Sequence, residues 1–163
     1  MKTSLGKCSL LKCAAWLVLA ALVTPPALAT SCAPTPGQEA EQLVRLHSHL
    51  MVITLSCRSG GDGQSLTTPY QTFTQAHLQR IKDAERLLMQ QRGGASKVDR
   101  MRTDYHNEIS IKLAQLSPST FCLSYRDDVA KAAALNEAAL TERLASMAAE
   151  SKSGACAQRQ ASK

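Results

Sequence analysis

The stretch that decides the fold runs from Gln38 to Cys57 and reads QEAEQLVRLHSHLMVITLSC. Its main apolar residues recur three and four positions apart: Leu43, Leu46, Leu50, Ile53 and Cys57. This spacing places them on one face of an α-helix. We therefore expect a helix over residues 38–57 that buries one stripe in a core.

Three further segments show helical periodicity, at residues 69–92, 96–116 and 118–150. Glycine pairs at 60–61 and 93–94, and a Ser-Pro pair at 117–118, mark the boundaries between the four helices. No segment alternates apolar and polar residues as a half-buried strand does. The sequence thus predicts an all-α fold. Helices of this length joined by short loops favour an antiparallel up-down four-helix bundle.

The N-terminus has the three zones of a secretory signal peptide. Three lysines and no acidic residue open it, an apolar run occupies residues 13–23, and Ala27-Leu28-Ala29 matches an A-x-A cleavage site. The apolar run is too short to span the ~30 Å of a bilayer core. We therefore expect cleavage of residues 1–29, Thr30 at the start of a single domain over residues 30–163, and a periplasmic or secreted location.

Four cysteines remain in the expected mature domain: Cys32, Cys57, Cys122 and Cys156. An even number of cysteines without C-x-x-C spacing predicts two disulfides in an exported protein, and not a zinc site. The up-down bundle puts Cys32 and Cys156 at one end and Cys57 and Cys122 at the other, so we expect those two pairs. A Cys32–Cys57 bridge would have to cross a helix of about 28 Å on a tether of about 20 Å. Other pairings stay open only if the last helix breaks in the alanine-rich stretch after Asp128.

Several short motifs add a resemblance. They are Leu50-x-Val52-x-x-Leu55-x-Cys57, Tyr70-x-x-Phe73, Thr103-x-x-x-Asn107-x-x-Ser110 and Phe121-Cys122. Over about residues 43–125 the chain resembles a family of small exported helical bacterial proteins of unknown function. The resemblance implies a helical bundle and implies no activity.

The histidines do not make a recognisable metal motif. His47 and His49 point about 200° apart on their helix, and no histidine follows an acidic residue by three positions, as di-iron bundles require. His77 lies on an apolar stripe, where a buried, hydrogen-bonded histidine is the simplest interpretation. We expect no metal and no cofactor. The alternative is a metal- or haem-binding bundle that uses His47 and Met51 with His77 or His106.

Catalytic motifs are missing, which leaves an enzyme with a site assembled by folding as a second alternative. Four polar residues are predicted to face inward from different helices and would mark a small-molecule pocket: His77, Asn107, Ser110 and Asn136. The simpler interpretation is that such residues fix the register of the helices by hydrogen bonding.

Charge is most uneven at the turn after the second helix. Four cations surround the Gly93-Gly94 turn: Arg92, Lys97, Arg100 and Arg102. A solvated surface explains them simply, whereas the functional interpretation is a patch for an anionic partner. The absence of stacking aromatic residues among these cations argues against nucleic acid.

The chain has 19 basic and 13 acidic residues, a net charge of +6, and loss of the three signal lysines would halve it. The features above predict an exported, non-enzymatic binding or interaction protein. Its expected partner is another exported protein or an anionic envelope surface.

Overall fold

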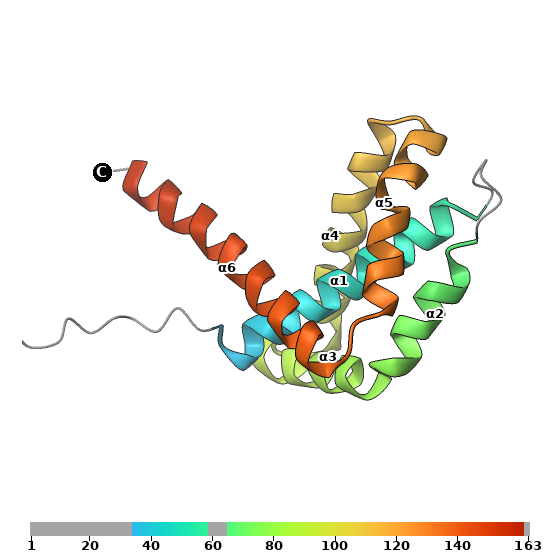
Figure 1. The fold of residues 1–163 in the computed structure, drawn as a ribbon. Helices are drawn as coiled ribbons and strands as arrows, with labels where there is room; N and C mark the ends of the chain where they lie inside the picture. The colour runs from blue at the N-terminus through green and yellow to red at the C-terminus, as the bar shows by residue number, and fades with distance from the viewer. Residues whose placement is uncertain (1–33, 59–64, 162–163) are drawn as a thin grey trace, which may run out of the picture. The chain divides into compact units, whose positions relative to one another are not determined.

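The computed structural model describes residues 34–58 and 65–161, with side chains up to Ser151. Over these residues the chain forms six α-helices and no strand, which confirms the all-α prediction (Figure 1). The helices are α1 (Pro36–Ser56), α2 (Thr67–Ala76), α3 (Leu78–Arg92), α4 (Ala95–Ala114), α5 (Pro118–Ala133) and α6 (Glu137–Ala161). The predicted signal peptide and Cys32 lie outside the described residues.

The first helix, α1, begins at Pro36 because Thr35 caps it. The hydroxyl of Thr35 accepts a hydrogen bond from the backbone N–H of Gln38 at 3.3 Å, and the Thr35 N–H donates to Gln38 Oε1 at 2.9 Å. This reciprocal capping box satisfies backbone donors that the first turn leaves unpaired. Pro36 suits the first turn because its ring fixes φ near the helical value.

Helix α1 is the central helix of the described domain. It contacts each of α2, α3, α4, α5 and α6. Its buried residues include Leu43, Leu50 and Ile53 from the predicted stripe, and also Val44 and Ser48, which lie well off that stripe. A helix of an up-down bundle buries one stripe, whereas α1 is covered on several sides. The described residues therefore form α1 with five helices packed around it, in place of the four-helix bundle that the sequence predicts.

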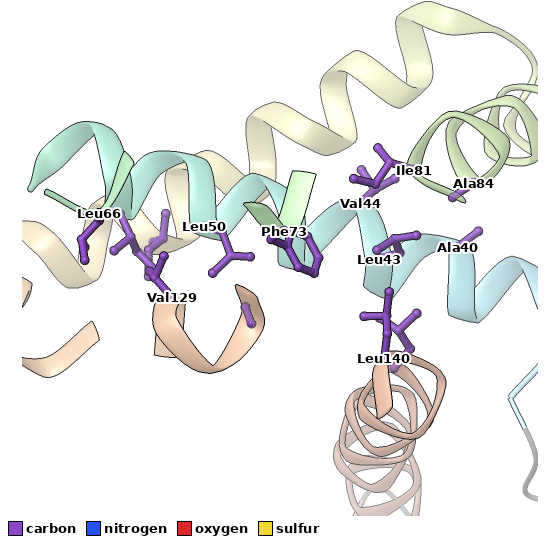
Figure 2. Packing of buried hydrophobic residues seen from close by; sticks show 14 of the residues in the cluster. Ala40, Leu43, Val44, Leu50, Leu66, Phe73, Ile81, Ala84, Val129 and Leu140 are labelled. Carbon is purple, nitrogen blue, oxygen red and sulfur yellow. The ribbon is translucent and has the colours of Figure 1, made fainter. Parts of the chain in front are cut away.

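The core follows α1 along its length. Figure 2 shows Leu140 of α6 facing Leu43, and Ile81 of α3 next to Val44. Every other helix also supplies a large side chain that is almost fully buried, namely Phe73, Leu88, Ile109 and Phe121. Each such side chain contributes about 1.5–3 kcal/mol through the hydrophobic effect. The common core holds the helices in the arrangement that shapes the sites described below.

The predicted helix 69–92 is two helices that meet at His77. Helix α2 packs mainly against α5, whereas α3 packs against α1 and α4. One straight helix could not reach both sets of neighbours. The backbone of His77 has φ −113° and ψ 15°, and its side chain is 2 % exposed. The break therefore turns a polar side chain into the interior.

The predicted helix 118–150 also breaks, between α5 and α6. The N–H groups of Ala134 and Leu135 bond to carbonyls three residues back, which closes α5. Asn136 then caps α6, since its Oδ1 accepts a hydrogen bond from the backbone N–H of Ala139 at 2.9 Å. The negative charge of Glu137, in the first turn of α6, interacts favourably with the positive end of the helix dipole. The break lets α6 leave α5 and pack on α1.

One of the two predicted disulfides is confirmed. Cys57, the residue after α1, is bonded to Cys122 in the first part of α5, with Cα atoms 5.5 Å apart. This bridge fixes the end of α1 to the start of α5. The predicted Cys32–Cys156 bridge lies outside the residues whose side chains are described. The break before α6 removes the continuous last helix from which that pairing was argued.

Candidate functional site

The polar residues predicted to line an inward pocket do not share a site. His77 is buried, but Asn107, Ser110 and Asn136 are exposed. Their predicted inward orientation is therefore wrong. Helix α4 buries the face that carries Val98, Met101 and Ile109, so its polar residues at 107 and 110 point to solvent. Asn136 is outside a helix interior and serves as a cap.

His77 is the buried, hydrogen-bonded histidine that the sequence predicts. Its Nδ1 lies 2.8 Å from Glu137 Oε1, and its Nε2 lies 3.0 Å from the backbone oxygen of Leu135. Both ring nitrogens therefore have a hydrogen-bond partner. Arg80 also donates to Glu137, at 2.9 Å. The hydrogen bonds from His77 and Arg80 lower the pKa of the Glu137 carboxyl. Because His77 stands at one helix break and its partners at the other, its role is to hold the two breaks together.

The residues of the metal-binding alternative have other partners. His47 Nε2 lies 3.1 Å from the Tyr70 hydroxyl and 3.4 Å from the Thr74 hydroxyl, and its ring stacks on Tyr70. Burial lowers the pKa of His47, and the nearby positive charge of Arg102 and His106 lowers it further. Between residues 34 and 151, no three His, Cys, Asp or Glu side chains of the described chain are grouped as metal ligands. His47 is therefore hydrogen-bonded to side chains of α2.

The predicted cationic patch is partly neutralised. Gly93 and Gly94, with φ of 83° and 119°, make the α3–α4 turn in the left-handed region that glycine tolerates. Arg92 pairs with Glu41 of α1, and Arg102 pairs with Glu85 of α3 at 3.2 Å. Arg102 is not among the residues that line the hollow beside the other three cations.

Three of the four predicted cations do converge. Arg92, Lys97 and Arg100 border a shallow hollow of about 390 Å³ together with the acidic residues Glu41 and Asp104. Lys97 and Arg100 are exposed and keep their charged ends in water. The patch predicted from sequence is thus reduced to these two cations beside an ion-paired arginine.

A polar network joins α1 to α4 on the side of the core next to this hollow. Arg45 makes a forked pair with the Glu108 carboxylate, with Nε 3.1 Å from Oε2. Tyr105 donates its hydroxyl proton to Glu41 at 2.8 Å. The pKa of Glu108 is lowered by its hydrogen bond from Arg45, against the opposing effect of burial. Burial lowers the pKa of His49, whose Nε2 lies 3.5 Å from Glu108. The charged groups of Arg45 and Glu108 thus pair with each other, and Glu41 accepts a hydrogen bond from Tyr105. We assign this network the structural role of joining α1 to α4.

A cavity of about 520 Å³ lies between α1, α4, α5 and α6. Its inner surface is aliphatic and comes from all four helices: Leu46, Leu50, Ile53, Ile109, Ala132, Leu135 and Met147. Leu46, Leu135 and Met147 are only half-buried, so the cavity leaves apolar surface uncovered. We refer to it as the α6 pocket. Its shape and apolar lining are those of a small-molecule site.

Charged side chains border the α6 pocket on its outer side. They are Lys112 of α4, Lys131 and Asp128 of α5, and Arg143 of α6, and all four are exposed. None of them was a candidate site residue predicted from the sequence. They come together only because α6 leaves α5 at Asn136. The signal that could have revealed this was Asn136 itself, a preferred helix cap inside a stretch that otherwise continues the helical pattern.

No protein-family model, curated protein or solved structure matches this chain. None of the helices in the described part of the chain combines the length and apolar character needed to cross a membrane.

Proposed function

We propose that this chain is an exported, non-enzymatic binding protein whose ligand site is the α6 pocket. The observation that carries the proposal is the uncovered aliphatic cavity of about 520 Å³ between four helices. Small-molecule pockets have volumes of ~300–1,000 Å³ and mostly apolar walls with a few polar groups. The pocket shares both properties.

The proposed export rests on the signal-like N-terminus and on cysteine chemistry. The Cys57–Cys122 disulfide supports an oxidising compartment, where such bonds persist. We place the protein in the periplasm or outside the cell, in a family of small exported helical proteins like that suggested by its sequence motifs. There it would meet lipid, cell-wall polymer and other exported proteins.

The second disulfide, Cys32–Cys156, belongs to the same proposal. With Cys57 and Cys122 bonded, Cys32 and Cys156 are the two cysteines left in the expected mature domain. Gln42 Nε2 lies 3.5 Å from Ser151 Oγ, so α6 passes the N-terminal half of α1 shortly before residue 156. Peptide mapping without reduction should yield a Cys32–Cys156 peptide. Free thiols at both positions would contradict this pairing.

Binding of a neutral apolar dye, N-phenyl-1-naphthylamine, tests the ligand site. The parent protein should bind the dye saturably, and Met147→Trp should weaken binding at least fivefold because the larger side chain fills the pocket. The matched control is Ser146→Trp, which adds the same group one residue away at an exposed position outside the pocket lining. Far-ultraviolet circular dichroism verifies that all three proteins are folded. Equal dye binding by all three proteins, or no binding by the parent, would contradict the proposed site.

A further inference from the structure

The cations around the α6 pocket differ from the other cross-helix cations of the protein. Elsewhere, an arginine that meets another helix finds an acid there: Arg45 with Glu108, Arg80 with Glu137, Arg92 with Glu41, and Arg102 with Glu85. At the α6 pocket, Lys112, Lys131 and Arg143 come from three helices, and within residues 34–58 and 65–151 none of them forms an ion pair. Asp128 is the single acid among the residues that line the pocket. The outer side of the pocket therefore carries a surplus of positive charge.

The interior of the pocket has the opposite character. Leu46, Leu50 and Ile53 of α1 face Ile109 of α4 and Met147 of α6 across it. His49, which also lines it, adds little charge there because burial lowers its pKa. Apart from the rings of His49 and Tyr125, the inner lining is aliphatic, and such a surface suits a flexible hydrocarbon chain.

From this juxtaposition we propose that the α6 pocket binds a free single-chain amphipathic anion, a carboxylate with an aliphatic tail such as a fatty acid. The inference rests on the proposed function and names its ligand class. The tail would lie against the aliphatic lining, and the carboxylate would lie among Lys112, Lys131 and Arg143. Ammonium groups and guanidinium groups both donate charge-assisted hydrogen bonds to carboxylates.

The size of the pocket favours one chain. At the ~30 Å³ that a water-sized group occupies in a liquid, the cavity of about 520 Å³ holds about 17 such groups. A tail of twelve or more methylene-sized groups together with its carboxylate therefore fills it. The two chains of a phospholipid would not enter it together.

Displacement of the bound dye measures the preference. Dodecanoate should displace N-phenyl-1-naphthylamine from the parent at a concentration about tenfold lower than 1-dodecanol, which has the same tail without the charge. In the triple variant Lys112→Gln, Lys131→Gln and Arg143→Gln, dodecanoate should lose this advantage while 1-dodecanol displaces the dye as before. High salt should reduce the advantage in the parent, since exposed charges are screened.

The matched control removes three positive charges at exposed positions outside the pocket lining, by Arg58→Gln, Lys82→Gln and Arg86→Gln. In this control variant, dodecanoate should still displace the dye at a concentration about tenfold lower than 1-dodecanol. Equal displacement by dodecanoate and 1-dodecanol in the parent, or an equal loss in the control, would overturn the ligand class. So would displacement by phosphatidylglycerol vesicles without displacement by dodecanoate, because the occupant would then be a membrane surface.

The two proposals fail in different ways. If the dye does not bind, or if Met147→Trp leaves its affinity unchanged, the pocket is not a ligand site. If the dye binds in the pocket and dodecanoate has no advantage, the pocket remains a site and the anionic ligand class is wrong.

Discussion

At the scale of single residues, His77 connects two helix junctions that are distant in sequence. It stands between α2 and α3, and its ring is hydrogen-bonded to Leu135 and Glu137 at the junction of α5 and α6. A buried polar group is costly unless it is hydrogen-bonded, and here both ring nitrogens are paired. The buried histidine was predictable from its place on an apolar stripe. Its partners were not, because they come from a helix break about sixty residues away.

Replacing His77 with leucine should lower the free energy of unfolding by about 2–3 kcal/mol. The change removes the hydrogen-bond partner of the Leu135 carbonyl and one hydrogen-bond partner of Glu137. Urea unfolding of the mature domain measures the loss. The control His106→Leu, at a half-buried position without a hydrogen bond to another described helix, should change stability by less than about 0.5 kcal/mol. An equal loss of stability from the two substitutions would contradict the proposed role of His77 in linking the two junctions.

The pKa values of His47 and His49 predict a pH dependence. Burial lowers both below 6.5, so the unfolded chain binds protons at these residues more readily than the folded one. Their contribution to stability is therefore complete above pH 6.5 and is lost as the pH falls below it. Between pH 7.5 and 5.5, the parent should lose more stability than the double variant His47→Gln and His49→Gln. A larger loss in the double variant would reverse the predicted sign.

At the scale of helices, the sequence predicted where helical segments lie better than where they break. The α1 stripe, the Gly93-Gly94 turn and the predicted Cys57–Cys122 bridge all correspond to the structure. The break at His77 was missed, and a break after Asp128 stood only as an alternative, because helical periodicity continues across both positions. Packing between helices decides where these breaks occur. Helix α2 packs mainly on α5 and helix α6 packs on α1, and the local sequence pattern does not reveal either neighbour. The α6 pocket was unpredictable for the same reason.

Asn136→Ala should cost about 1 kcal/mol of stability, because it removes the side-chain acceptor that caps α6. Thermal and urea unfolding give the value. Asn107→Ala is the matched control, since it makes the same substitution at an exposed position inside α4. There alanine has the higher helix propensity, so stability should stay the same or rise slightly. A loss of the same size at both positions would mean that Asn136 is no cap.

The α3–α4 turn is an element whose charge can be tested separately. Lys97→Glu with Arg100→Glu should weaken association with phosphatidylglycerol vesicles several-fold at low salt and leave the fold intact, because both side chains are exposed. Arg102 is unsuitable for this test since it pairs with Glu85. Arg58→Glu with Lys82→Glu reverses the same number of charges elsewhere and should have a smaller effect. If the two pairs weaken vesicle sedimentation equally, net charge and not the turn governs the association.

At the scale of the whole described domain, α1 and the five helices around it leave one large aliphatic space uncovered. Helix α6 packs on α1 through Leu140, Leu144 and Ala148, and it diverges from α5 beyond Asn136. The α6 pocket is a consequence of that divergence. The cations of three helices meet beside it, whereas most other cross-helix cations are paired. Fold, pocket and charge thus point to one binding site.

Hydrogen–deuterium exchange with and without saturating dodecanoate tests this central claim most directly. Binding in the α6 pocket should slow exchange in segments that line it, around residues 109–112, 128–135 and 143–147. Exchange at the α3–α4 turn, residues 92–100, should be unchanged. Slower exchange at that turn alone, or no change anywhere in the described helices, would contradict the account.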